Sequence, residues 1–259
     1  MATLRAEIFK APVFLAAVFI LIGGDLNAQQ AQARRVAARY PLSLYTVIDS
    51  PTAEVLDYGN FAFGTRFFSK GGLLPHTTFG VFQRLMVGFS MELDNYIGNG
   101  DVDLQRPELQ VKLRFYDGDR FLPAAAIGYD SQGYRYNKTI KAYREEERGL
   151  YLTLTREMLF SGLEWSFGGN ISDFKSDEAR AFTSASWISP QSKFGLTVEY
   201  DNIHHKRWNR LNAGTYFFLS PFVHMGFHVR DTLATKTLRN SPELRRPERV
   251  IDIRYITSF

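Results

Sequence analysis

Apolar and polar residues alternate along most of the chain, in segments whose length of about ten residues suits a tilted transmembrane strand. Leu109, Val111 and Leu113, for example, are separated by polar residues. Successive side chains of a β-strand point to opposite faces. Each segment therefore predicts a strand with one apolar and one polar face, and residues 194–200 and 223–229 repeat the pattern.

The alternation predicts twelve strands, at residues 55–68, 76–83, 85–95, 107–117, 120–130, 147–157, 161–172, 179–189, 192–202, 209–219, 221–231 and 248–258. Tight turns alternate with long connections, which fall at residues 69–75, 95–106, 131–146, 172–178, 202–208 and 232–247. Outer-membrane barrels sort their loops in this way, whereas a soluble sandwich has no reason to do so. We therefore predict an all-β fold, a transmembrane antiparallel up-and-down β-barrel of about 12 strands, over residues 54–259. Pro123 inside the fifth strand and poor alternation in the eighth fit less well.

The N-terminus predicts export. Arg5 and Lys10 precede an apolar run, Ala11 to Ile22, with small residues after it. The run is too short to span a bilayer as a helix, so we interpret residues 1–28 as a cleaved signal peptide, with a retained membrane anchor as the alternative. Residues 29–53 are then expected to form a periplasmic segment before the barrel.

The last strand alternates up to an aromatic residue, Phe259, with Tyr255 on the same face. It resembles the final strand of bacterial outer-membrane barrels, and the resemblance implies that Tyr255 and Phe259 form a signal read by the barrel-assembly machinery. Aromatic residues also gather at the ends of other strands, where amphipathic rings favour the lipid headgroups. Localisation in a bacterial outer membrane is therefore expected.

Composition excludes several classes of protein. After residue 30 no apolar run is long enough for a transmembrane helix. Cysteine is absent, which excludes disulfides and thiolate metal sites. The formal net charge is only +4, and the basic residues are scattered along strands and loops, so we expect no nucleic-acid partner.

Candidate chemistry is sparse. Asp201, His204 and His205 lie together near a predicted outer rim, but no serine nucleophile motif accompanies them, so a polar loop is the simpler interpretation. Asp101 and Asp103, near Asp94 and Asn95, lack the spacing of a calcium loop. We expect no catalytic residue, no metal and no cofactor.

The polar faces of the strands predict the residues that line the barrel lumen. His224 and His228 share a face but lie roughly 13 Å apart along a strand, too far for one metal ion. The predicted lumen residues are Arg66, Glu92, Lys112, Arg114, Glu164, Glu199, Asp201, His224, His228, Arg230, Asp252 and Arg254. Both signs of charge occur, so the pattern leaves open whether the lumen is a narrow pore or a closed interior.

Several stretches between residues 50 and 135 resemble bacterial outer-membrane barrels of the YjbH-like kind. They are Ser50-Pro51-Thr52-Ala53, Leu56-Asp57-Tyr58-Gly59, Gly88-Phe89-Ser90, residues 97–101, residues 107–115 and residues 122–134. Members of that group are associated with exopolysaccharide or cell-envelope systems. The resemblance implies a barrel but brings no catalytic motif.

The sequence thus favours an outer-membrane barrel of structural or transport, porin-like type. Its expected partners are outer-membrane lipid, the assembly machinery, and polysaccharide or small solutes. Two alternatives stay open: a barrel-embedded hydrolase with its site near Asp201, His204 and His205, and a soluble exported β-sandwich or lipocalin-like binder.

Overall fold

The structure, a computed structural model, describes residues 44–159, 161–172, 178–189, 193–203, 205, 209–234 and 245–258. The expected signal peptide, His204 and Phe259 lie outside these residues. The described residues belong to one compact unit, Ser43–Phe259. None of the helical turns within them is long and apolar enough to cross a membrane.

The secondary structure consists almost entirely of strands. They are β1 Asn60–Phe68, β2 Gly72–Phe82, β3 Leu85–Asp94, β4 Asp103–Tyr116, β5 Ala124–Asp130, β6 Tyr134–Asn137, β7 Ala142–Glu145, β8 Gly149–Glu157, β9 Leu163–Ile171, β10 Ala179–Ile188, β11 Phe194–Asp201, β12 Arg210–Phe218, β13 Val223–Arg230 and β14 Glu248–Ser258. One short 3-10 turn, η1 Ser69–Gly71, joins β1 to β2.

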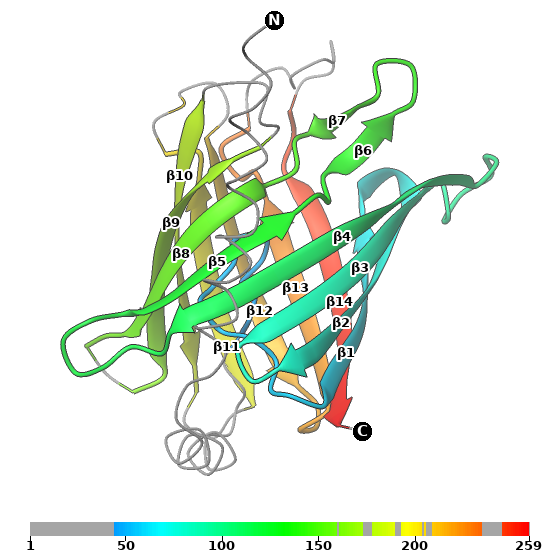
Figure 1. Ribbon diagram of the computed structural model, residues 1–259. Helices are drawn as coiled ribbons and strands as arrows, with labels where there is room; N and C mark the ends of the chain where they lie inside the picture. Colours follow the sequence, from blue (N-terminus) through cyan, green and yellow to red (C-terminus); the bar gives the residue numbers. More distant parts are fainter. Residues whose placement is uncertain are drawn as a thin grey trace, which may run out of the picture. The chain divides into compact units, whose positions relative to one another are not determined.

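Twelve of the described strands form a closed antiparallel barrel (Figure 1). Each barrel strand pairs with its neighbour in the chain, and β1 closes the sheet against β14, with Arg66 opposite Asp252. The exception is β5, which pairs with β8 because β6 and β7 form a separate two-stranded hairpin. The predicted all-β, up-and-down barrel of about 12 strands is confirmed.

The barrel has two different ends. Short turns join β2 to β3, β8 to β9, β10 to β11 and β12 to β13, and the strands β1 and β14 begin and end on that side. We call it the turn end; in Figure 1 it carries the C-terminus. The longer connections, including the β6–β7 hairpin, lie at the opposite, loop end.

The two faces of the barrel wall differ as the alternation predicts. In β11, Leu196 and Val198 are exposed on the outside, whereas Thr197 and Glu199 are buried inside. The exposed outer residues include Phe63, Phe89, Leu109, Phe115, Tyr129, Leu150, Leu152, Trp165, Phe167, Phe194, Phe217, Phe227, Val229, Ile251 and Tyr255. A closed sheet with an apolar exterior satisfies its backbone hydrogen bonds internally, as a lipid environment requires.

Three local expectations change. The connection predicted at residues 69–75 is only the turn η1, since Pro75 lies in β2 opposite Thr65. The fifth barrel strand begins at Ala124, after Pro123, because proline has no N–H to donate to the sheet. The poorly alternating segment is regular in β10, where Arg180, Phe182, Ser184, Ser186 and Ile188 all face inward and are buried.

Candidate functional site in the barrel lumen

Nearly all the side chains that the sequence predicts in the lumen are buried. Those buried inside the barrel are Arg66, Glu92, Lys112, Arg114, Glu199, Asp201, His224, His228, Arg230, Asp252 and Arg254. Glu164 is half-buried. So many buried charges require partners, because an unpaired charge in a protein interior is strongly destabilising.

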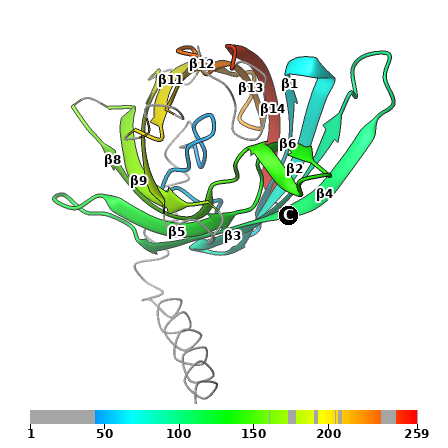
Figure 2. The same cartoon turned by 90° about the horizontal axis from the view of Figure 1, so that it is seen from above.

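Residues 44–54 turn back on themselves inside the barrel, and we call this segment the inner hairpin. Thr46 and Pro51 form an antiparallel bridge, and the Val47 N–H donates to the Ser50 carbonyl at 2.9 Å. Seen along the barrel, this blue stretch lies within the ring of strands (Figure 2). The sequence predicts residues 29–53 to be a periplasmic segment ahead of the barrel, and the described part of that segment, residues 44–53, lies inside the barrel.

The inner hairpin enters and leaves the lumen at the turn end. Leu44 packs with Ile188 and Phe218, which end the strands β10 and β12 beside their turns. Asp49, at the tip of the hairpin, contacts Arg230, which ends β13 at the loop end. The hairpin therefore spans most of the lumen with its tip toward the loop end.

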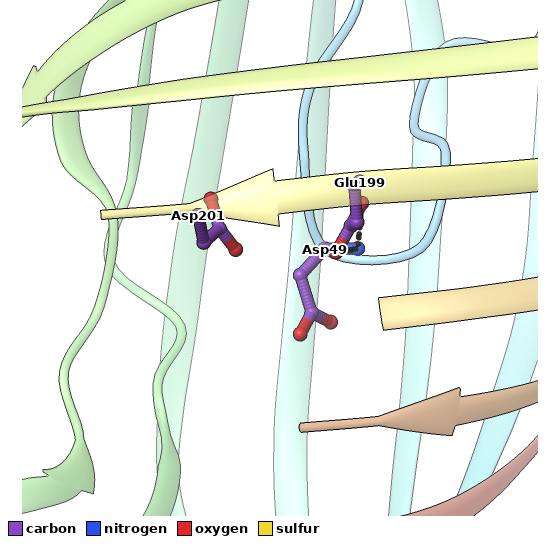
Figure 3. A group of neighbouring side chains, drawn as sticks. All are labelled: Asp49, Glu199 and Asp201. Carbon is purple, nitrogen blue, oxygen red and sulfur yellow. Dashed lines mark hydrogen bonds between the residues drawn. The ribbon is translucent and has the colours of Figure 1, made fainter. Parts of the chain in front are cut away.

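Glu199 of β11 holds the turn of the inner hairpin through its backbone. The Glu199 carboxylate accepts the N–H groups of Ile48, Asp49 and Ser50 at 2.9–3.1 Å. Figure 3 shows the bond from Asp49. The side-chain amide of Asn212 also donates to it, at 2.6 Å. A buried N–H without a partner costs free energy, so a single wall carboxylate satisfies three backbone donors that the turn cannot pair internally.

Lys112 of β4 donates hydrogen bonds to carbonyl groups of the inner hairpin. Its Nζ donates to the carbonyl oxygens of Tyr45, Thr52 and Glu54, at 2.6, 3.0 and 3.0 Å. These three acceptors belong to both arms of the hairpin. One buried ammonium thus ties the two arms to the same strand of the wall.

Other strands complete the pairing of the hairpin backbone. The Tyr216 hydroxyl donates to the Val47 carbonyl at 2.6 Å, and the Thr153 hydroxyl donates to the Pro51 carbonyl at 3.0 Å. These contacts come from β12 and β8, on different sides of the lumen. The wall therefore surrounds the hairpin with matched donors and acceptors.

The Asp49 carboxylate is bound by groups from three separate elements. Arg66 of β1 donates to its Oδ1 at 2.9 Å, and the Tyr134 hydroxyl of β6 donates to the same oxygen at 3.1 Å. Arg230 donates through Nε to Oδ2 at 2.6 Å. Burial alone would raise the pKa of Asp49, but the guanidinium groups of Arg230 and Arg66 hold that pKa well below its ordinary value.

The strands β6 and β7 form a second hairpin at the loop end, which we call the mouth hairpin, Tyr134–Glu145. Glu92 of β3 accepts the N–H groups of Arg135 and Tyr136 at 2.6 and 3.3 Å. The Tyr143 hydroxyl donates to Glu108 at 2.7 Å. These bonds hold the mouth hairpin against the barrel wall, so the side chains of Tyr134 and Glu145 reach the lumen.

Arg230 joins the two hairpins to the wall. Besides Asp49, it donates to Glu145 of the mouth hairpin at 2.7 Å and to Glu248 of β14 at 2.6 Å. Its guanidinium also lies 4.0 Å from the centroid of the Tyr134 ring. Arg230 is buried, and all three of its nitrogens are engaged by different parts of the chain.

Asp49, Glu199 and Asp201 bring carboxylate oxygens within 4.8 Å of one another (Figure 3). Each is engaged by donors of the protein: Asp201 accepts from Arg148 at 3.0 Å and from the Ser50 hydroxyl at 3.4 Å. The three acids therefore serve to hold the inner hairpin. A cavity of about 160 Å³ remains beside it, lined by polar wall groups as well as by Asp49.

The remaining candidate residues contact other groups of the protein. Asp94 and Asp103 accept from the Gln105 amide at 2.8 and 3.2 Å. The His205 imidazole lies 3.8 Å from the Glu178 carboxylate. His224 packs on the edge of Phe218, His228 packs on the edge of Tyr216, and Tyr255 faces outward.

Neither hairpin was predicted from the sequence. Leu44 to Ile48 is an apolar stretch without strand alternation, followed by a turn signal at Asp49-Ser50-Pro51. That combination was available as a sign of a buried turn. Nothing comparable in the sequence indicates the role of Tyr134 and Glu145, because the sequence of a long connection does not show which of its side chains reach the lumen.

The closed sheet, apolar exterior, charged interior and unequal ends define the class: an outer-membrane β-barrel of porin-like architecture. A scan against protein-family models finds no match, and a search of curated proteins finds none. Among solved structures, the chain is similar to a "KdgM porin" at 8% identity and a TM-score of 0.49, covering 77% of this chain and 99% of that one. It is also similar to Omp33, an outer membrane protein of Acinetobacter baumannii, at 11% identity and a TM-score of 0.41, covering 80% and 100%. At this level of similarity the class rests on the geometry of the barrel itself.

Proposed function

We propose that the protein is a porin-like outer-membrane channel whose lumen the inner hairpin holds closed at rest. One observation carries the proposal: the wall supplies side-chain donors and acceptors for the backbone of a segment that is not part of the wall. Glu199 accepts hydrogen bonds from three N–H groups, and Lys112 donates hydrogen bonds to three carbonyl oxygens. This complementarity distinguishes a lumen plugged by a separate segment of the chain from a lumen filled by the side chains of the wall strands.

The size and connectivity of the barrel support this function. A barrel of about twelve strands is wider than the eight-stranded barrels whose interiors side chains can fill. Both arms of the inner hairpin connect at the turn end, because Leu44 lies there and β1 begins there. The hairpin can therefore leave the lumen toward that side without unthreading the barrel. In outer-membrane barrels the short turns face the periplasm, so withdrawal is toward the periplasm.

The finer assignment is also a proposal. The resemblance to YjbH-like barrels supports a relationship to that group and, through it, a link to exopolysaccharide or cell-envelope systems. The resembling stretch begins at Ser50-Pro51-Thr52-Ala53, which is the return arm of the inner hairpin. Tyr255 and Phe259 are proposed to be read by the assembly machinery, and the outward, exposed side chain of Tyr255 supports this.

Conductance of the refolded protein in a planar bilayer tests the channel. We expect low conductance from the natural sequence and a large increase from the double substitution Glu199→Gln and Lys112→Met. Each lost charged hydrogen bond is worth about 1.5–3 kcal/mol, so the loss of both anchors should release the hairpin. A second variant, with residues 44–54 replaced by a glycine–serine linker of equal length, should conduct without any substitution in the wall.

Lys193→Met is the matched control, because it removes a positive charge from the exposed turn after β10. It should conduct like the natural sequence. Heat modifiability and β content in detergent show whether each variant has folded. Folded variants that stay as non-conducting as the natural sequence would contradict the channel and favour a structural barrel.

A further inference from the structure

Asp49 occupies its position as a ligand would. Its carboxylate comes from the inner hairpin, while its three donors, Arg66, Arg230 and Tyr134, come from two wall strands and the mouth hairpin. Two guanidinium groups and a hydroxyl converging on one carboxylate form the usual arrangement for recognising carboxylates. The protein's own acid therefore fills a site that the rest of the fold constructs.

The donors keep their places by contacts that do not involve Asp49. Arg230 is held by Glu248 at 2.6 Å and by Glu145 at 2.7 Å. Arg66 lies 3.5 Å from Asp252, its partner across the β1–β14 pairing. The contacts of Arg230 therefore do not depend on the inner hairpin, whereas Arg66 also donates to the Ile48 carbonyl of the hairpin at 2.8 Å. Glu145, Glu248 and Asp252 pair with further arginines, Arg210, Arg135 and Arg254, so loss of the Asp49 charge removes a counter-charge from Arg66 and Arg230.

The site opens onto the remaining space of the lumen. The cavity of about 160 Å³ beside the inner hairpin is lined by Asp49, Arg66, Arg230 and Tyr134. A small solute in that cavity meets the same guanidinium groups that bind Asp49.

We propose that Arg66, Arg230 and Tyr134 form a binding site for a carboxylate-bearing solute, and that Asp49 occupies this site as an internal competitor in the closed state. The effect of this site on channel opening rests on the proposed channel function, whereas the existence of the site does not. A tethered group competes as if present at roughly millimolar concentration. A solute with one carboxylate must therefore reach about that concentration to displace the tip of the hairpin from the natural protein.

Chemical rescue with acetate tests the site. We expect acetate to bind Asp49→Ala and to raise its Tm saturably, by about 3 °C at ten times its Kd. Sodium chloride at equal ionic strength should give a clearly smaller rise. In the natural protein Asp49 competes for the site, so the response should be smaller and shifted to higher acetate concentration. Asp49→Asn, which keeps the shape of the side chain, is the second variant if Asp49→Ala does not fold.

Two further variants locate the response. Adding Arg230→Gln to Asp49→Ala should abolish the acetate effect. Glu54→Ala removes the other acid of the inner hairpin, which pairs with Arg114, and should respond to acetate like the natural protein. An acetate response no larger than that to chloride, or one that persists without Arg230, would overturn the site. Equal responses to sulfate and phosphate would overturn the assignment to carboxylates.

Conductance separates this inference from the proposed channel. Asp49→Ala should conduct more than the natural protein, and acetate should change that conductance over the same concentration range as it changes Tm. A Tm response without any conductance would support the site and contradict the channel. Conductance without an acetate-specific response in either measurement would support the channel and contradict the site.

Discussion

The two ends of the inner hairpin are held by different physical forces. At the turn end, Leu44 packs in an apolar cluster with Ile188, Tyr216 and Phe218. At the loop end, Asp49 is bound by guanidinium groups and a hydroxyl. Apolar burial is non-directional and involves no charge, whereas the ionic contact depends on charge and can be replaced by another anion.

The difference assigns separate roles to the two ends. Buried ion pairs add little net stability, because the attraction between the charges is offset by the loss of their hydration. The apolar end therefore contributes most of the affinity of the hairpin for the lumen, together with the backbone bonds to Glu199 and Lys112. The ionic end fixes where the tip lies and makes that position sensitive to the solution.

The largest effect is expected when the ionic end loses its central cation. Arg230→Gln leaves Asp49, Glu145 and Glu248 buried without their shared partner, and removing one member of such a pair costs about 3–5 kcal/mol. Hydrogen exchange at the Ile48 and Ser50 amides should accelerate strongly, since both amides are held in the lumen by Glu199. Arg249→Gln, on the exposed face of β14, is the control and should leave exchange unchanged.

Breaking the apolar end should cost slightly less. Leu44→Ala removes a buried side chain that is 4% exposed, and such changes typically cost about 2–5 kcal/mol. Exchange at the same amides should accelerate, and the increase should be the same at low and high salt. A strong salt dependence would mean that charge also acts at this end. Leu219→Ala, in the exposed turn after β12, should have no effect.

Acidification should loosen the ionic end of the inner hairpin. Because the pKa of Asp49 is lowered in the folded protein by Arg230 and Arg66 against the opposing effect of burial, its contribution is complete above about pH 4, the ordinary carboxyl value. That contribution declines as pH falls toward the lowered pKa. Conductance should rise below about pH 4, less than in Arg230→Gln because protonated Asp49 still fits its site. Asp49→Asn should lack this component of the pH dependence.

The smallest effect is expected at Glu54. Its side chain is 26% exposed and pairs with Arg114 at 3.0 Å, and such partly solvated pairs contribute about 0–1 kcal/mol. Glu54→Gln should therefore barely change amide exchange in the hairpin. The Lys112 bond to the Glu54 carbonyl belongs to the backbone and survives the substitution. A cost as large as that of Leu44→Ala would show that the return arm is a third anchor.

Much of the barrel could be predicted because the alternation within each strand shows which side chains lie on which face. Thr197 and Glu199 inside, with Leu196 and Val198 outside, follow from position in the strand alone. The same rule predicts Lys112, Arg230 and Asp252 as lumen residues, and all three are buried, but it does not predict their partners. Local exceptions such as Pro123 were also decided by local chemistry, because a residue without an N–H can end a strand's pairing.

The barrel, its approximate strand number and the polarity of its faces follow from local sequence, since these depend on a period of two residues and on loop length. Occupation of the lumen, and the segment that occupies it, depend on contacts between residues far apart in the chain. Glu199 and Ser50 are 149 positions apart, and Arg230 and Asp49 are 181 apart. No local pattern encodes such contacts. They form because closure of the sheet encloses charges that must find partners, and the inner hairpin supplies them.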